Sequence, residues 1–273
     1  MMLDPKKFLE SLNRNKIDFA TGVPDSLLKD VCAYITDHFP SDRHIIATNE
    51  GSAIGLAIGH YLSTARPALV YMQNSGLGNT INPLTSLADP KVYGIPMILM
   101  IGWRGEVVEG EQIHDEPQHK KQGLVTLEQL DLLDIPFQVI DANSNIDEVI
   151  DELIEVTMEI SGPVALVVRK GTFEKYKLKS ANENSQLPTR ESAIEKIVEV
   201  LPNEIPIVST TGMASRELFE IRKRNNMGHQ RDFLTVGGMG HALQIATGIA
   251  LNKPSSKVVC IDGDGALLMH TGG

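Results

Sequence analysis

Residues 236–273 read VGGMGHALQIATGIALNKPSSKVVCIDGDGALLMHTGG, and this stretch decides the fold class of the chain. The run KVVCI at residues 257–261 is apolar and β-branched, which is typical of a strand buried on both faces of a parallel sheet. It ends at Asp262-Gly263-Asp264-Gly265. Open α/β sheets bind ligands at the carboxyl ends of their strands, where glycine backbone can approach a phosphate and a carboxylate can hold a metal ion. The stretch therefore predicts an α/β domain with a phosphate-type loop.

The composition indicates a globular protein with room for two α/β domains. The chain has 273 residues, of which 42% are hydrophobic and 22% charged. Its net charge of −10 argues against a general nucleic-acid binder, which needs a basic face. The first residues, MMLDPKKFLE, lack the apolar core of a signal peptide, and no apolar run approaches a membrane span. We expect a cytoplasmic enzyme in which Cys32 and Cys260 are core thiols.

Strand and helix patterns alternate along the chain, which predicts doubly wound parallel sheets. In the first domain, residues 1–178, apolar runs lie at 17–21, 44–47, 68–72, 95–101, 137–140 and 164–168, with helical patterns at 26–38, 50–64, 77–88 and 145–160. The polar residues 179–189, KSANENSQLPT, are expected to be a linker. A second α/β series fills residues 190–273, with strands expected at 205–209, 233–236 and 257–261. Because three strands ending on a glycine turn do not complete a domain, we expect a fragment or a truncated gene product.

Glu50 opens the predicted helix EGSAIGLAIGHYLST. A carboxylate in the first turn of a helix often serves only the helix dipole and the capping of free N–H groups. However, Gly51, Gly55 and Gly59 recur every four residues and leave a bare stripe on which another backbone can pack closely. These features favour a packed interface with one buried carboxylate, and a buried carboxylate is a functional candidate.

Three motifs in order carry a family resemblance. A glutamate opens a glycine-rich helix in the first domain, and G-G-M-G and then G-D-G follow in the second. This combination resembles the thiamine diphosphate (ThDP)-dependent 2-oxo-acid decarboxylases. The resemblance implies that Glu50 hydrogen-bonds N1′ of the cofactor's aminopyrimidine ring, that Met239 bends the cofactor, and that the Gly237 carbonyl accepts from its 4′-amino group.

The resemblance also implies a bound Mg²⁺. Asp264 of the G-D-G run would be a metal ligand, whereas the family's second ligand, an asparagine, would lie beyond residue 273. The turn at Thr211-Gly212 would offer N–H groups to the diphosphate. The cofactor-binding residues expected on these grounds are Glu50, Asn74, Thr211, Gly212, Gly237, Met239, Gly263, Asp264 and Gly265.

Further segments narrow the resemblance to the phosphonopyruvate decarboxylases and their near relatives, the sulfopyruvate decarboxylases. These segments are GVPDSLL at residues 22–28, MQNSGLGN at 72–79, GWRGE at 102–106, HDEPQHKKQG at 114–123 and TTGMASREL at 210–218. The implied reaction decarboxylates 3-phosphonopyruvate to phosphonoacetaldehyde, a step in phosphonate biosynthesis. The family's active site lies between subunits, so a homodimer or higher oligomer is expected.

Other polar residues are candidates for contact with the substrate. Asp25 lies in a strand-to-helix turn, where it serves either as an N-cap or in proton transfer. His114 lies in a polar loop (residues 114–121) that is either solvated surface or a source of acid–base chemistry. A metal site in its His/Asp/His run lacks a coherent ligand set. The expected substrate-binding residues are Asp25, Ser26, Arg104 and Lys120, the last two as partners of a phosphonate.

Two alternatives remain open from the sequence, and a third is disfavoured. A sulfonate differs from a phosphonate mainly by one charge, so a sulfopyruvate decarboxylase is the nearest alternative. A non-catalytic fragment that only binds a partner chain belongs to a different class. A nicotinamide oxidoreductase is disfavoured because no G-x-G-x-x-G opens a helix in the required βαβ context.

Overall fold

The chain divides into two compact units, Met1–Ala181 and Asn182–Gly273, in a computed structural model that describes residues 2–179 and 187–272. Each unit contains a parallel sheet with helices on both faces, so the predicted α/β class is confirmed. The expected linker at residues 179–189 lies mostly outside the described ranges. No helix within those ranges has the length and apolar character that crossing a membrane requires.

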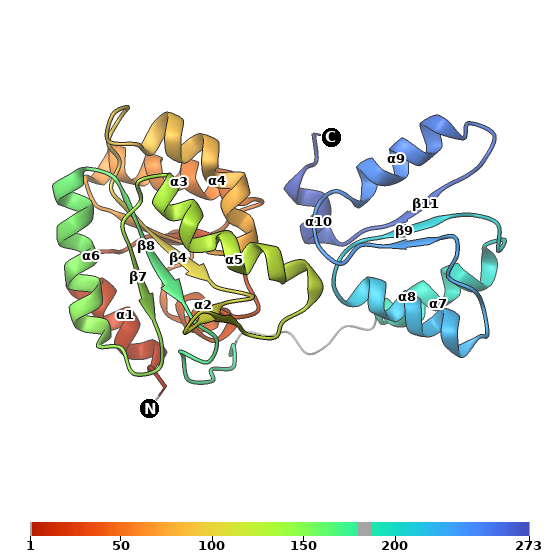
Figure 1. Ribbon diagram of the computed structural model, residues 1–273, viewed down its shortest axis with the longest axis horizontal. Helices are drawn as coiled ribbons and strands as arrows, with labels where there is room; N and C mark the ends of the chain where they lie inside the picture. Colours follow the sequence, from red (N-terminus) through yellow and green to blue (C-terminus); the bar gives the residue numbers. More distant parts are fainter. Residues whose placement is uncertain (1, 180–186, 273) are drawn as a thin grey trace. The chain divides into compact units, whose positions relative to one another are not determined.

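A six-stranded parallel sheet forms the centre of the first unit, with the order β2-β1-β3-β4-β8-β7. Strands β4, β8 and β7 of this sheet are labelled in Figure 1. Its strands are β1 (Ala20–Gly22), β2 (His44–Ile46), β3 (Ala68–Gln73), β4 (Met97–Gly102), β7 (Phe137–Ile140) and β8 (Pro163–Val168). From β1 the chain moves outwards to β2, then returns past β1 to β3 and β4. The strand order therefore reverses between β1 and β3, and open α/β sheets bind ligands at such a reversal.

Alternate side chains of these strands enter two cores, one on each face of the sheet. Leu69 and Tyr71 lie in the core covered by α1 (Pro5–Arg14), α2 (Lys29–His38) and α6 (Ile146–Ile160). Val70 and Met72 lie in the other core, which α3 (Glu50–Thr64), α4 (Leu77–Pro83) and α5 (Pro117–Leu132) cover. A 3-10 turn, η1 (Asn74–Gly76), precedes α4, and a π-helical segment, η2 (Leu84–Ala88), follows it. All six predicted strands of this unit are present, although β1 begins at Ala20 instead of residue 17.

The predicted polar loop at residues 114–121 is wrong in its second half, where α5 begins at Pro117. Proline suits the first helical position because its missing N–H would have no helical partner there. The first turns of α5 are polar, including the buried His119, and the buried apolar side chain Leu130 comes near the end of the helix, so the sequence hides where the helix begins. A short hairpin of β5 (Val107–Val108) and β6 (Glu111–Gln112) precedes it, and neither this hairpin nor α1 is predicted above.

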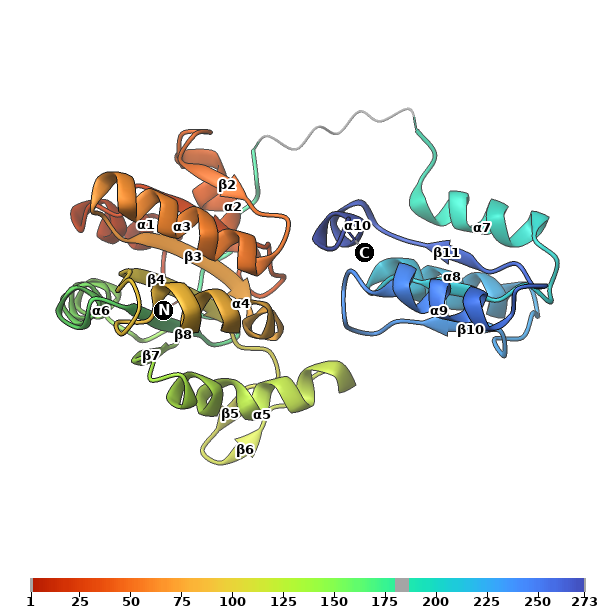
Figure 2. The same cartoon turned by 90° about the horizontal axis from the view of Figure 1, so that it is seen from above.

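The second unit contains a three-stranded parallel sheet with the order β10-β9-β11 (Figure 2). The strands are β9 (Ile207–Ser209), β10 (Asp232–Leu234) and β11 (Val259–Ile261). Helices α7 (Arg190–Val200) and α8 (Met213–Arg224) cover one face, α9 (Ala242–Asn252) covers the other, and α10 (Asp264–Met269) follows β11. Because β10 and β11 both pair with β9 in the parallel direction, the loops that follow all three strands leave the same edge of the sheet.

Candidate active site

Glu50 is a buried carboxylate held by the segment that follows β3. It begins α3 as predicted, while Asn49 caps the helix by accepting from the Ser52 N–H at 2.9 Å. The Glu50 side chain accepts from Asn79 Nδ2 at 2.7 Å, and the residue is only 5% exposed. A Cβ atom at Gly76 would lie 2.5 Å from Glu50 Oε1. The absence of a side chain at position 76 therefore makes room for this carboxylate, and dipole stabilisation alone would not require such packing.

Asp25 is a second buried carboxylate, in the turn between β1 and α2. Its Oδ2 accepts from the Leu27 and Leu28 N–H groups at 3.1 and 3.2 Å, whereas Oδ1 is buried without a hydrogen-bond partner in the described chain. Burial raises the pKa of Asp25 to about 6, against the lowering effects of the two N–H groups and of Arg104. One oxygen thus stabilises the turn and the other remains available. Both predicted roles are compatible with this geometry.

Arg104 follows β4 and is held by a carboxylate of its own chain. Its Nε and Nη2 donate to Asp115 at 2.8 and 2.6 Å, which holds the pKa of Asp115 well below its usual range. Its Nη1 donates to Ser26 at 3.1 Å, so the predicted residues Ser26 and Arg104 meet. Lys120 lies on the exposed side of α5, outside the cavity described next. Much of the Arg104 charge is therefore already compensated, and the contact of Lys120 with a phosphonate stays a prediction.

A cavity of about 330 Å³ lies beside Arg104, at the carboxyl edge of the sheet. Its size suits a small ligand. The predicted residues Ser26, Arg104 and His114 line it. The sequence prediction misses four further charged lining residues, although the first belongs to the quoted motif G-W-R-G-E. These residues are Glu106, Lys29, Asp30 and Lys170.

Asn74 ties two loops of the site together. It is fully buried, and its Nδ2 donates to the Arg104 carbonyl and to Thr126 Oγ1, both at 2.9 Å. Its Oδ1 accepts from the Arg104 N–H at 3.3 Å. The side chain of Asn74 is thus already engaged within the chain, and a contact of its backbone with the cofactor stays a prediction. This engagement makes Asn74 a positioning residue for the segment after β4.

The second unit presents glycine backbone, together with the carboxylate of Asp264, at its carboxyl edge. Gly212, which precedes α8, has a φ of +88°, and Gly238 and Gly240 have φ values of +66° and +92°. These left-handed conformations favour glycine and expose N–H groups. Met239 stands between two of them with 38% of its surface exposed. Thr210 Oγ1 is buried nearby, after β9, without a hydrogen-bond partner in the described chain.

The residues present fit a diphosphate with magnesium. A Cβ atom placed at Gly212 or Gly265 would meet no atom of the described chain within 4 Å, so both segments border open space. Asp264 begins α10 and is exposed, and its Oδ1 accepts from the Gly265 N–H at 2.8 Å. Within the described ranges, no three His, Cys, Asp or Glu residues are grouped to hold a metal ion. Mg²⁺ bound through phosphate and water needs only one or two carboxylates, and Asp264 can be one of them.

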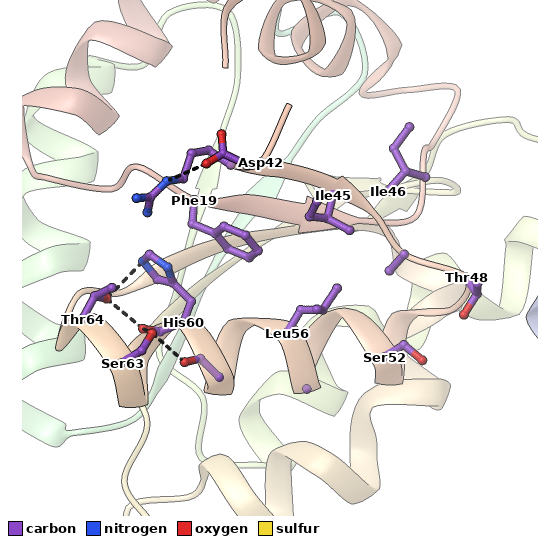
Figure 3. A pocket seen from close by; sticks show the side chains of 14 residues that line it. Phe19, Asp42, Ile45, Ile46, Thr48, Ser52, Leu56, His60, Ser63 and Thr64 are labelled. Atoms are coloured by element: carbon purple, nitrogen blue, oxygen red, sulfur yellow. Dashed lines mark hydrogen bonds and ion pairs between the residues drawn. The ribbon is translucent and has the colours of Figure 1, made fainter. Parts of the chain in front are cut away.

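A groove of about 910 Å³ runs between β2 and α3 (Figure 3). Gly55 and Gly59 line it, and a Cβ atom at either would meet nothing within 4 Å. Ile46 and Leu56 also line it, with 57% and 39% of their surface exposed. The described part of this chain therefore leaves the predicted glycine stripe uncovered at Gly55 and Gly59. Gly51 is covered, because a Cβ atom there would lie 3.0 Å from the Asn79 carbonyl.

Two histidines pack on aromatic rings outside the site, and of the two expected core thiols only Cys32 is buried. His60 is buried and stacks on Phe19 with ring centroids 4.8 Å apart, and His229 stacks on Phe219 at 4.2 Å. Cys32 is buried and free, and burial raises its pKa. Cys260 is also a free thiol but is only half-buried.

Two family descriptions match the chain. The thiamine pyrophosphate enzyme, N-terminal TPP binding domain, matches residues 6–129. The thiamine pyrophosphate enzyme, C-terminal TPP binding domain, matches residues 210–273. Thiamine pyrophosphate and ThDP are the same cofactor. The two matches fall on the two units described above.

Curated relatives include two phosphonopyruvate decarboxylases. That of Streptomyces viridochromogenes is 34% identical over 269 residues, covering 92% of this chain and 64% of the relative. That of Streptomyces hygroscopicus is 32% identical over 293 residues, covering 99% and 68%. The sulfopyruvate decarboxylase subunit alpha of Methanococcus maripaludis is 35% identical over 154 residues, covering 56% and 86%. The chain thus spans about two thirds of the length of the first two relatives.

Proposed function

Because the chain belongs to the phosphonopyruvate decarboxylase family of thiamine pyrophosphate enzymes, we propose that it decarboxylates 3-phosphonopyruvate. The products are phosphonoacetaldehyde and CO₂, in a step of phosphonate biosynthesis. The observation that carries the proposal is the buried Glu50 carboxylate, which Asn79 holds beside Gly76 at the start of α3. Its position suits a hydrogen bond to the cofactor's pyrimidine ring.

Each unit would supply its own kind of contact to the cofactor. When bound, ThDP supplies the electron sink that loss of CO₂ from a 2-oxo acid requires. The first unit, as the pyrimidine-binding domain (residues 1–178), would contribute Glu50. The second, as the diphosphate-binding domain (residues 190–273), would support the cofactor through Met239 and the Gly237 carbonyl. Its anion and metal contacts would come from Thr211, Gly212, Gly263, Asp264 and Gly265.

Asp25 is the proposed proton donor to the substrate carbon. After CO₂ leaves, the electron pair that remains on that carbon takes up a proton. With a pKa of about 6, Asp25 retains a proton more readily than an ordinary aspartate, and its Oδ1 is free to hold that proton. His114, which is exposed at the cavity, would exchange protons between this region and solvent. Ser26 and Arg104 would orient the substrate at the cavity wall.

A second copy of the chain is the proposed occupant of the groove between β2 and α3. The exposed Ile46 and Leu56, together with the bare Gly55 and Gly59, would let another subunit's backbone approach closely. The family resemblance indicates that Glu50 serves a cofactor held by the partner subunit. A homodimer is then the minimum active assembly.

The test is an assay of the full-length protein with 3-phosphonopyruvate, ThDP and Mg²⁺. We expect phosphonoacetaldehyde from the unmodified enzyme and at least about a 100-fold loss of turnover in Glu50→Gln. Glu128→Gln on the exposed face of α5 is the matched control and should keep full activity. Equal turnover in Glu50→Gln and the control would refute the role of Glu50.

Sulfopyruvate is the second candidate substrate, because a sulfopyruvate decarboxylase subunit is 35% identical to part of the chain. Competition between the two keto acids in one reaction gives the ratio of their kcat/KM values directly. A ratio that favours sulfopyruvate would move the protein to that activity and leave the cofactor assignment intact.

A further inference from the structure

Glu106 lines the cavity beside Arg104 and has an unused hydrogen-bonding atom. The residue is 7% exposed, and its Oε2 is buried without a hydrogen-bond partner in the described chain. Arg169 Nε lies 3.8 Å from that oxygen, beyond hydrogen-bond distance, and the Lys170 N–H reaches only the other oxygen, at 3.4 Å. A buried acceptor without a donor is destabilising unless a ligand supplies one.

The other carboxylates at the cavity are already engaged. Asp115 accepts at both oxygens from Arg104 and backbone N–H groups. Asp30 accepts from the Tyr176 N–H at 3.1 Å. Lys29 and Lys170 bring positive charge to the same cavity, which suits an anionic ligand, whereas Asp115 compensates much of the charge of Arg104. Glu106 therefore places a carboxylate at the wall of a cavity suited to anions, an arrangement that repels an anion unless a proton lies between the two.

We propose that Glu106 selects a phosphonate over a sulfonate by accepting a hydrogen bond from the protonated oxygen of the phosphonate. This inference rests on the proposed function and names the residue that determines its substrate. A phosphoryl-type group takes up its second proton near pH ~6, so a phosphonate can bring a P–O–H donor to the cavity close to neutral pH. A sulfonate is the anion of a strong acid and has no such proton. It could bind only if Glu106 itself became protonated.

The test compares the binding of two inert ligands, phosphonoacetate and sulfoacetate, to the full-length protein with ThDP and Mg²⁺. Titration calorimetry at pH 7.5 should show tighter binding of phosphonoacetate. In Glu106→Gln the amide can donate a hydrogen bond to either anion. The ratio of the affinity for phosphonoacetate to that for sulfoacetate should therefore fall by about tenfold to a hundredfold. Glu111→Gln, an exposed change of the same chemistry on β6, should leave the ratio unchanged.

The pH dependence gives a second measurement. Between pH 7 and pH 8.5 the unmodified protein should bind phosphonoacetate progressively more weakly, because the shared proton becomes harder to supply. In Glu106→Gln the same affinity should stay constant or rise, since the dianion then meets only cations and an amide. Comparing the two proteins removes the contributions of the other charged groups around Glu106, which are Lys29, Asp30, Arg104, His114, Asp115, Arg169 and Lys170.

The outcomes separate this inference from the proposed function. An unchanged ratio in Glu106→Gln, or identical pH profiles in the two proteins, would overturn the role of Glu106 even if 3-phosphonopyruvate is turned over. If neither keto acid is decarboxylated, the proposed function fails, whatever Glu106 does to the binding of the two anions. The inference is supported if Glu106→Gln has a lower ratio of phosphonoacetate to sulfoacetate affinity and its affinity for phosphonoacetate stays constant or rises with pH.

Discussion

Asp25→Asn should give a protein that is more stable than the unmodified enzyme at neutral pH but much slower. Asp25 is 5% exposed, and burial raises its pKa to about 6. The ionised carboxylate is therefore unfavourable in the folded state. Asparagine has nearly the same shape, keeps an oxygen that can accept from the Leu27 and Leu28 N–H groups, and carries no charge.

The size of the stability change follows from the pKa of Asp25 in the folded state and its ordinary value in the unfolded state. Each tenfold difference is worth ~1.36 kcal/mol, so a pKa of about 6 in place of 3.8 corresponds to about 3 kcal/mol of lost stability for the ionised form. The folded state binds the proton more tightly, so this loss is absent below pH 3.8, develops as the pH rises to about 6, and is constant above that. The amide N–H₂ of asparagine would find no acceptor at the Oδ1 position, and this unpaired donor lowers the gain in stability by roughly 1 kcal/mol. A net gain of about 2 kcal/mol remains at pH 7.5.

Denaturant unfolding of both proteins at pH 4.5 and pH 7.5 measures this effect. The stability difference between Asp25→Asn and the unmodified protein should widen by about 2 kcal/mol between the two pH values. Effects of other titrating groups cancel in that difference. Asp131→Asn is the control, because Asp131 is exposed on α5 and its substitution should change stability little at either pH. Turnover of 3-phosphonopyruvate by Asp25→Asn should fall by roughly 100-fold or more if Asp25 donates the proton.

The predicted change with pH requires a carboxyl group whose pKa differs between the folded and unfolded states. A stability difference between Asp25→Asn and the unmodified protein that is the same at both pH values would therefore refute the burial argument. Higher stability with undiminished turnover would retain the burial argument and remove Asp25 from proton transfer. The stability and the activity thus test separate steps of the reasoning.

Three further substitutions test the site and its supports. Gly76→Ala places a Cβ 2.5 Å from Glu50 Oε1, so we expect a displaced carboxylate, a fold unchanged by circular dichroism, and roughly tenfold or greater loss of turnover. In Gly59→Glu the new Cβ meets no atom of the described chain within 4 Å, so thermal stability of the subunit should not fall while sedimentation shows at least tenfold weaker self-association. Arg222→Met breaks a buried pair in which Nη2 donates to Asp232 at 2.9 Å, and should destabilise the second unit by about 3–5 kcal/mol in denaturant unfolding.

The sequence predicts most of the fold because the strands are continuous apolar runs. Segments such as 68–72 and 164–168 correspond closely to β3 and β8, since strands buried on both faces carry apolar side chains at every position. Helix α5 is missed for the opposite reason. Its N-terminal half is polar where it borders the site, so periodicity cannot distinguish it from a loop there. The hairpin of β5 and β6 has two-residue strands, which are too short to give a pattern.

Candidate site residues are predicted by type, but their partners are not. Arg104 is expected to meet a phosphonate, yet the fold brings Asp115 to its guanidinium, and no local pattern indicates a pair that forms across the intervening hairpin. Lys120 is exposed on α5 and does not line the cavity, and the sequence pattern does not predict this helix. Glu106 escapes prediction because a single glutamate after a strand has no distinguishing spacing. Only its burial and its unpartnered oxygen single it out.

The two units differ in the kind of group they present, and this difference determines how substitutions should act. At the carboxyl edge of the first sheet, charged side chains such as Glu50, Asp25 and Arg104 are fixed by packing and hydrogen bonds. At the edge of the second, Gly212 and Gly238 present backbone N–H groups in left-handed conformations. Adding a Cβ there strains the backbone itself, so it should weaken the binding of any bound anion without altering selectivity. Changes in the first unit, by contrast, alter charge and proton affinity and should alter the choice of substrate and the pH dependence.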